Sequence, residues 1–217
     1  MFHSDILART GRSCSHLKCR GITSVIKELY FPEYRFTYSD GGVIGAPPKK
    51  KDTISGMARG RLVDRQVELW IRGGKVNRKK FHPFSRAFIA LTERLCLKPV
   101  GAQVVVRDES CNIATLVDAV FLDPKGRVVL VELKTGFEGY NETSTGLMHG
   151  AFSYMTNCPA NQHQVQLAFT QMMFQRTFPE FGTVTALVVR MTSAGAHVRA
   201  IGSREKTAVR LAQKSMR

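Results

Sequence analysis

The sequence predicts an α/β fold in which a central mixed β-sheet is flanked by helices. Along the 217 residues, the spacing of apolar side chains changes from helical to alternating and then back to helical. The strand-like runs are rich in Val, Ile and Leu, and a helical segment separates the third run from the fourth. The core elements therefore follow the order α-β-β-β-α-β, which is typical of an α/β domain with a mixed sheet.

The N-terminal part of the chain is expected to be helical. A short helix, capped by Thr23 or Ser24, is expected to end at Pro32. Two longer helices should follow a loop rich in Gly and Pro, at about 53–71 and about 83–97. Each of these helices has Gly or Pro residues just beyond its end, which supports its boundary.

Strands dominate the remainder of the chain. Five are expected, and they cover residues 102–107, 113–122, 127–134, 183–191 and 196–201. The Asp-Pro-Lys-Gly sequence at 123–126 has turn chemistry, so the second and third strands should form a hairpin. A helix is expected at 161–177, before the fourth strand, and residues 136–150 have few apolar anchors and are expected to form a loop.

Charge and composition divide the chain into a basic arm at 1–20, a domain at 21–202 and a basic C-terminal helix at 203–217. The formal net charge of +15 indicates a polyanionic partner, nucleic acid rather than a membrane surface. The arm has a composition that also fits a mitochondrial presequence. No apolar run approaches the roughly 20 residues of a membrane helix, so no membrane partner is expected.

The five cysteines are scattered and odd in number, which indicates reduced thiols and an intracellular setting. The sequence does not name the compartment, and a nuclear, mitochondrial or viral setting would suit it.

Three charged side chains lie on the otherwise apolar hairpin: Asp118, Glu132 and Lys134. Glu132 and Lys134 are two residues apart, so they project from one face of their strand, and the hairpin places Asp118 beside them. Two carboxylates this close repel each other unless a divalent cation such as Mg²⁺ binds between them. The ammonium group can then act on a metal-bound water, which is the chemistry of phosphodiester hydrolysis. The alternative is a structural Glu132–Lys134 salt bridge on an exposed sheet face.

The pattern of Asp118 followed by Glu132-Leu133-Lys134 resembles the motif of the PD-(D/E)xK nuclease superfamily, although Val117 replaces the proline of that name. The resemblance implies a restriction-endonuclease-like core. It also implies that Asp118, Glu132 and the carbonyl of Leu133 hold Mg²⁺, for which Mn²⁺ can substitute. Lys134 would act on the attacking water.

Two further motifs resemble the RecB-like and lambda-exonuclease-like branch of this superfamily. The sequence GRLVDRQVE at 60–68 is similar to the G-x-x-x-H-x-x-x-E helix, which implies that Glu68 is a catalytic metal-binding acid. Asp64 replaces the usual His and can still ligate magnesium. The alternative for both acids is a solvated helix face that pairs with nearby arginines. The branch's iron–sulfur versions need a cysteine cluster that this chain lacks, so no iron–sulfur cluster is expected.

The second of these motifs is HQVQLAFTQ at 163–171, which is similar to the Q-x-x-x-Y helix. Gln166 fits its glutamine best and is expected in the catalytic site, with Gln164 as the alternative register. Thr170 stands where the branch has Tyr.

Further residues are expected to contact DNA, because they are basic and close to the Glu68 helix or polar and close to the other motifs. They are Arg59, Arg61, Arg65, Arg72, Lys79, Lys80, Tyr140 and Gln164. Phe81, His82 and Phe84 could stack on unpaired bases, although core packing is the favoured interpretation.

Together these features predict a magnesium-dependent DNA nuclease. An exonuclease acting on single- or double-stranded DNA ends, in recombination, repair or genome processing, is the favoured form. Two alternatives stay open. One is a structure-specific endonuclease similar to a junction resolvase, which would act as a homo-oligomer. The other is a DNA-binding protein that kept the fold without the activity.

Overall fold

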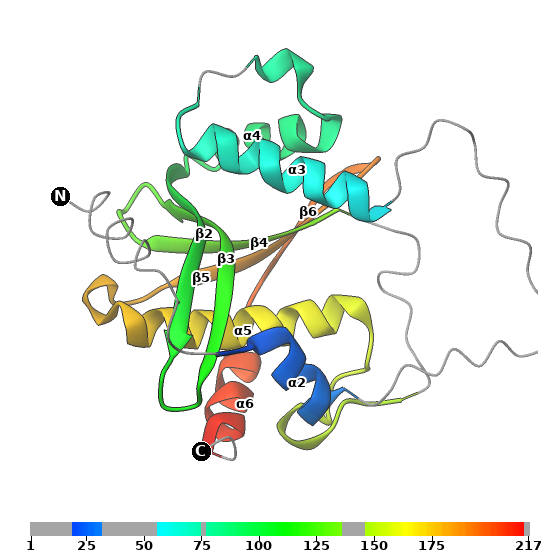
Figure 1. Ribbon diagram of the computed structural model, residues 1–217, viewed down its shortest axis with the longest axis vertical. Coiled ribbons are helices and arrows are strands. Elements are labelled where there is room, and N and C mark those ends of the chain that lie inside the picture. The colour runs from blue at the N-terminus through cyan, green and yellow to red at the C-terminus, as the bar shows by residue number, and fades with distance from the viewer. Residues whose placement is uncertain (1–18, 32–55, 75–76, 136–145, 215–217) are drawn as a thin grey trace, which may run out of the picture.

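A mixed sheet of six strands forms the centre of the computed structural model, which describes residues 19–31, 56–74, 77–135 and 146–214 (Figure 1). The strands are β1 (Arg20–Gly21), β2 (Lys98–Asp108), β3 (Ile113–Leu122), β4 (Val128–Thr135), β5 (Thr185–Thr192) and β6 (Gly195–Ala200). The helices are α2 (Ile22–Tyr30), α3 (Gly56–Ile71), α4 (Pro83–Arg94), α5 (Pro159–Thr177) and α6 (Ser203–Lys214). Short 3₁₀ turns are η1 (Arg78–Lys80), η2 (Gly150–Phe152) and η3 (Pro179–Phe181).

The strand order is β1-β3-β4-β5-β6, and β2 pairs with β3. The β2–β3, β3–β4 and β5–β6 pairs are antiparallel, whereas β1–β3 and β4–β5 are parallel. A parallel pair needs a crossover connection, and α5 lies in the connection between β4 and β5. The prediction of an α/β class with a central mixed sheet flanked by helices is confirmed.

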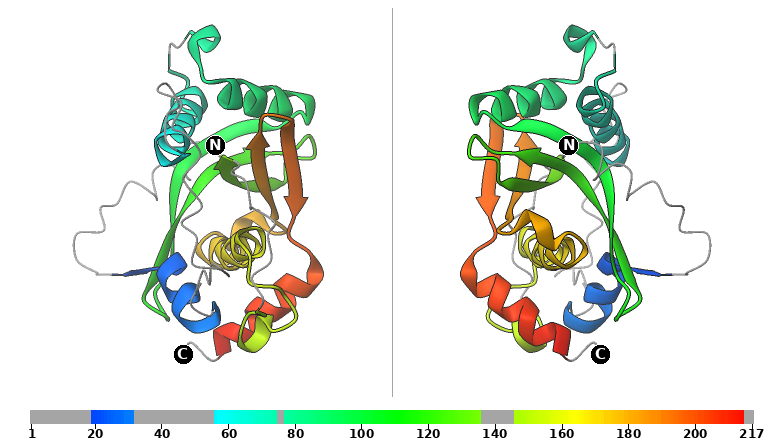
Figure 2. Two further views of the ribbon diagram at one scale, coloured as in Figure 1. Left: turned by 90° about the vertical axis from the view of Figure 1, so that its right-hand side faces the viewer. Right: turned by 90° about the vertical axis from the view of Figure 1, so that its left-hand side faces the viewer.

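Helices cover both faces of the sheet, as Figure 2 shows. α3 and α4 lie on one face, and α5 lies on the other together with α2 and α6. Because β4 is covered on both sides, alternate residues enter two different cores: Val128 and Leu130 pack with α5, and Val131 and Leu133 pack with α3. This explains why the strand sequence VVLVELKT is almost continuously apolar.

β3 and β4 diverge partway along their length. They are paired from Leu122–Val128 to Ala119–Val131 and no further. Beyond that point β3 continues alongside β2, while β4 continues alongside β5 as far as Thr135. We call this divergence, at Asp118 on β3 and Glu132 on β4, the fork.

Several element boundaries differ from the sequence-based expectation. The short helix begins at Ile22 and has Gly21 as its N-cap, so neither Thr23 nor Ser24 caps it. The cause is β1, which pairs with β3 and ends at Gly21. The helix expected to end at residue 97 ends at Arg94, and β2 begins four residues later.

Pro99 lies inside β2 rather than in a connection. In the described residues β2 pairs with β3 alone, and its register shifts between Pro99 and Gly101. Proline lacks a backbone N–H and is tolerated on an edge strand or at a bulge, and β2 offers both.

The structure describes parts of the two terminal segments that the sequence analysis set apart from the domain. Arg20 belongs to β1, whereas residues 1–18 of the expected basic arm lie outside the described residues. Helix α6 contributes Ala208, Val209 and Ala212 to the core, so this helix packs as part of the domain. Of the helices in the described residues, none combines the length and apolarity needed to cross a bilayer.

A buried carboxylate joins α5 and α6 to the end of β2. Asp108 Oδ2 accepts hydrogen bonds from Arg176 Nη1 and from Gln213 Nε2, both at 2.9 Å. Its Oδ1 accepts from the backbone N–H of Ser110. Burial raises the pKa of Asp108, but the Ser110 hydrogen bonds, the Arg176 charge and the Gln213 amide together hold this pKa below its ordinary value.

The Asp108→Ala substitution should lower the free energy of unfolding by about 2–4 kcal/mol, because it leaves the buried Gln213 amide without its acceptor. Urea denaturation measures this. The control is Glu93→Ala, which removes a solvent-exposed ion pair with Arg78 and should cost less than about 1 kcal/mol. Equal effects of the two substitutions would show that Asp108 does not hold the helices.

Candidate functional site

The Asp118 side chain lies at the fork and bridges the two diverging strands. Its Oδ2 accepts a hydrogen bond from the backbone N–H of Leu133 at 2.9 Å. This N–H lies just past the last β3–β4 pair, where the sheet ladder no longer provides an acceptor on β3. The carboxylate therefore takes the place of a strand carbonyl and is held at a defined position.

Glu132 is the buried member of the group, with 3% of its surface exposed. Its Oε1 accepts from Lys134 Nζ at 2.6 Å and from Gln166 Nε2 at 3.0 Å. Lys134 is on the same face of β4, and Gln166 comes from α5, which packs over that face. The structure thus brings together four residues that sequence reasoning placed in the site: Asp118, Glu132, Lys134 and Gln166. We call them, together with Asp64, the fork cluster.

Neighbouring carboxylates raise the pKa of two acids of the fork cluster, Asp118 and Asp64. Burial raises the pKa of Asp118, and the nearby Glu132 charge raises it further, to about 8, although Lys134 and the Leu133 amide act in the opposite direction. Burial also raises the pKa of Asp64, to about 6; Lys134 lowers it and Glu132 raises it. Acids gathered in this way repel each other, and a cation relieves the repulsion.

Glu68 does not join the cluster in the described part of the chain. Its Oε1 forms an ion pair with Arg72 Nη2 at 2.8 Å, which matches the solvated-face alternative for this acid. Gly60, in the second turn of α3, lies close to the Thr135 hydroxyl at the end of β4. Asp64, one turn further along the helix, is near enough to Asp118 to raise its pKa. The next turn, which carries Glu68, therefore lies beyond the fork. The metal-binding role of Glu68 therefore stays a prediction, and Asp64 is the acid of α3 that interacts with Asp118 in the described residues.

His163 is a cluster neighbour that sequence reasoning missed. It lies one turn before Gln166 on α5, and burial together with the charge of Lys134 lowers its pKa to about 3. The imidazole is therefore neutral near the ammonium group. The i, i+3 spacing of His163 and Gln166 could have identified it, because residues with this spacing share a helix face.

The residues expected to contact DNA are distributed unevenly. The solvent-exposed members are Arg61 and Arg65 on α3, Arg72 just after α3, and Lys79 and Lys80 on η1. Arg59 is half-buried, with its guanidinium 5.6 Å from the centre of the Phe84 ring. Gln164 is buried on α5, with 1% of its surface exposed. Tyr140 lies outside the described residues.

The three rings considered for base stacking have structural roles. Phe81 is buried, and Phe84 packs against the α3–α4 core. His82 is the N-cap of α4, because its Nδ1 accepts from the backbone N–H of Phe84 at 3.1 Å. These contacts agree with the favoured core-packing interpretation.

The donor atoms at the fork fit a hard divalent cation. They are carboxylate oxygens of Asp118, Glu132 and Asp64, and oxygen donors favour Mg²⁺ or Mn²⁺ over zinc. In the described residues no three His, Cys, Asp or Glu side chains are already grouped as a complete metal site. Magnesium commonly binds through one or two carboxylates and keeps several waters, so the Asp118 and Glu132 pair suits it.

Comparisons with known proteins do not assign the chain to a family. No family model matches it, and no curated protein matches it. Among solved structures, the chain is similar to one described as "Crystal structure of SSO0001", with 15% sequence identity over 73% of each chain and a TM-score of 0.31. At this TM-score the similarity supports no conclusion about function.

The metal-free protein should lose stability as the pH rises from about 6.5 to 8.5. The folded state keeps the Asp118 proton to about pH 8, whereas the unfolded chain releases it near its ordinary value of 3.8. The folded state therefore binds more protons in this range, and its stability falls by up to about 1.4 kcal/mol per pH unit. Asp64, with a pKa of about 6, is mostly ionised in this range, and His163, whose pKa falls from its ordinary 6.5 to about 3 on folding, opposes the trend only near pH 6.5.

Thermal unfolding in EDTA measures this effect, and Asp118→Asn should flatten the pH dependence. The control is Asp123→Asn, in the hairpin turn, where hydrogen bonds from Arg127 lower the carboxyl pKa. This substitution should leave the slope between pH 6.5 and 8.5 unchanged. An unchanged slope in Asp118→Asn would contradict the buried, protonated carboxyl.

Proposed function

We propose that the chain is a magnesium-dependent DNA nuclease of the PD-(D/E)xK superfamily, nearest to its RecB-like and lambda-exonuclease-like branch, with a restriction-endonuclease-like core. The observation that carries the proposal is the convergence of Asp118, Glu132, Lys134 and Gln166 at the fork. These residues come from two strands and a helix, in the order in which the superfamily's motifs follow one another. A chance Glu-x-Lys pair on a sheet would not bring a half-buried Asp and a helix Gln to the same point.

Asp118 and Glu132 would hold the cation, with the carbonyl of Leu133 as a further ligand implied by the resemblance. Mn²⁺ is expected to substitute for Mg²⁺. When bound, the metal supplies Lewis acidity and lowers the pKa of a bound water. Asp64 raises the pKa of Asp118, and Glu132 raises the pKa of Asp64, so Asp64 would complete the acidic side of the site.

Lys134 and Gln166 orient the reacting groups. Both bind Glu132 Oε1, so they fix one oxygen of this carboxylate and do not occupy Oε2. Lys134 Nζ donates to Glu132 and is positioned beside the acids of the fork cluster. With substrate bound, the ammonium group would hold the attacking water or a non-bridging oxygen of the scissile phosphate, where negative charge develops in the transition state.

The partner expected from the charge of the chain is DNA. The net charge of +15 favours a polyanion, and exposed cations lie along α3 and η1. By resemblance, the Gln helix favours cleavage from DNA ends. Asp64 and Thr170, which replace the His and Tyr of the branch, are the positions that would favour a DNA-binding protein without activity.

The Lys134→Ala substitution should reduce magnesium-dependent cleavage of linear DNA by at least about 100-fold, because it removes the donor beside the attacking water. The matched control is Lys125→Ala, in the hairpin turn at the other end of β4, which should cleave at the wild-type rate. The assay compares linear duplex, linear single-stranded and closed circular DNA, each with Mg²⁺, Mn²⁺ or EDTA.

Loss of linear substrate alone would establish an exonuclease, whereas cutting of circles would establish the endonuclease. Tight and salt-sensitive binding without cleavage of any substrate in Mg²⁺ or Mn²⁺ would reject the catalytic proposal. The chain would then be a DNA-binding protein.

The two acids of α3 should differ in their contribution to cleavage. Asp64→Asn removes a carboxylate coupled to Asp118 and should lower the rate by about 10–100-fold. Glu68→Gln removes an acid paired with Arg72 and should change the rate less than about 3-fold. Initial rates over a range of Mg²⁺ concentrations separate weaker metal binding from slower chemistry. A larger loss in Glu68→Gln would restore the role that the motif assigns to Glu68.

A further inference from the structure

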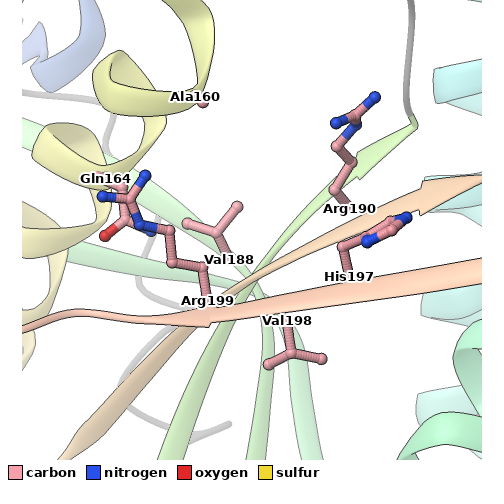
Figure 3. Close-up of a pocket in the computed structure, with 7 residues that line it drawn as sticks. All are labelled: Ala160, Gln164, Val188, Arg190, His197, Val198 and Arg199. Carbon is pink, nitrogen blue, oxygen red and sulfur yellow. The ribbon is translucent and has the colours of Figure 1, made fainter. Parts of the chain in front are cut away.

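A pocket of about 140 Å³ lies between the first turns of α5 and the strands β5 and β6 (Figure 3). Its polar lining is basic or neutral and consists of Gln164 from α5, Arg190 from β5, and His197 and Arg199 from β6. Val188 and Ala160 add apolar surface, and none of the described residues that line the pocket is acidic. The proposed nuclease mechanism uses none of these residues.

Gln164 carries the strongest evidence that this pocket binds a ligand. The side chain is 1% exposed, and neither Nε2 nor Oε1 has a hydrogen-bond partner within the described residues. Burying an amide without a partner costs free energy, and such groups are rare in folded proteins. A ligand with oxygen atoms in the pocket would satisfy the amide.

The cations of the pocket are held by the sheet. Arg190 pairs with His197 across β5 and β6, and Val188 pairs with Arg199, so these side chains project from one face in two adjacent rows. Arg199 Nη1 donates to Asn161 Oδ1 on α5 at 3.3 Å, which positions its guanidinium near Gln164. Figure 3 shows Gln164 and Arg199 at one side of the pocket, and Arg190 and His197 at the other.

The pocket continues the surface that carries the fork cluster. Across β4 and β5, Glu132 pairs with Val188 and Lys134 pairs with Arg190. One row of side chains therefore runs from Lys134 through Arg190 to His197, and the row beside it runs from Glu132 through Val188 to Arg199. Neighbouring strands are about 4.8 Å apart, so β6 lies roughly 10 Å from β4.

We propose that this pocket binds a phosphate group of the nucleic-acid strand, other than the phosphate that is cleaved at the fork. The guanidinium of Arg199 and the Nε2 amide of Gln164 are N–H donors suited to phosphate oxygens, and Arg190 and His197 add positive potential or further donors. The proposal rests on the proposed function, because it takes the strand at the fork as the source of the phosphate. That phosphate is either an internal phosphodiester or a terminal monoester.

The test measures binding rather than cleavage, with the full chain in EDTA and a fluorescent single-stranded DNA oligonucleotide. Each oligonucleotide of one set carries a single uncharged methylphosphonate, placed at a different position in each. Two further oligonucleotides differ only in having a phosphate or a hydroxyl at one end. Neutralising or removing the phosphate that occupies the pocket should weaken binding to the wild-type protein by about 10-fold. Arg199→Ala should bind the unmodified strand about 10-fold more weakly and show no further loss at that position. Arg210→Ala, at a solvent-exposed position of α6, should retain the full loss of affinity at that position.

Gln164→Leu provides a second readout that does not depend on locating the phosphate. The substitution keeps the approximate volume but removes the unpaired amide, so the unfolding temperature should stay constant or rise. DNA binding should nevertheless fall by about 10-fold. A lower unfolding temperature with unchanged affinity would mean that Gln164 is structural, and would overturn the proposal.

The two proposals fail in different ways. If the chain cleaves DNA, but each modified oligonucleotide weakens binding to Arg199→Ala as much as it weakens binding to the wild type, the pocket proposal is wrong and the nuclease proposal stands. If no DNA is cleaved, but neutralising one phosphate weakens binding to the wild type and not to Arg199→Ala, the pocket proposal stands for a DNA-binding protein. If a methylphosphonate at an internal position weakens binding, the pocket binds a phosphodiester. If only replacing the terminal phosphate by a hydroxyl weakens binding, the pocket binds a terminal phosphate. Absence of DNA binding would overturn the pocket proposal.

Discussion

The hydrogen bond from the Leu133 amide to the Asp118 carboxylate is the contact on which the arrangement of the site depends. β3 and β4 must separate, since each pairs with a different strand beyond the fork. Where they separate, a backbone N–H loses its ladder partner and needs another acceptor. A side-chain carboxylate provides it and so enters a region of low dielectric constant next to Glu132. Lys134 and Gln166 then compensate for the charge gathered there.

The fork also lets both layers of helices reach one point. A continuous sheet would separate α3 on one face from α5 on the other, whereas the opening allows Asp64 of α3 to interact with residues that face α5. The site therefore combines groups from opposite sides of the sheet. This makes its geometry sensitive to the packing of both cores, including the contact of Gly60 with Thr135.

Local patterns predicted the strands and the hairpin of the site, because runs of β-branched residues, turn residues and the alternation of side chains between the two faces of a strand are local properties. Asp118, Glu132 and Lys134 could be placed together for that reason. The choice between Asp64 and Glu68, however, depends on which turn of α3 lies at the fork, and a helix repeat alone cannot specify this. Gln164 and Gln166 posed the same problem on α5. Arg190 and His197 were missed because their position depends on pairing between distant strands.

The parallel pairing of β4 with β5 affects when the fork is completed during synthesis on the ribosome. β4 ends at Thr135, but α5 and its parallel neighbour β5 follow only in the last third of the chain. Until both have left the exit tunnel, Glu132 lacks Gln166 and β4 lacks one of its two neighbours. Because Gln166 and β5 follow β4 in the chain, the acidic constellation is completed only after these later segments have emerged.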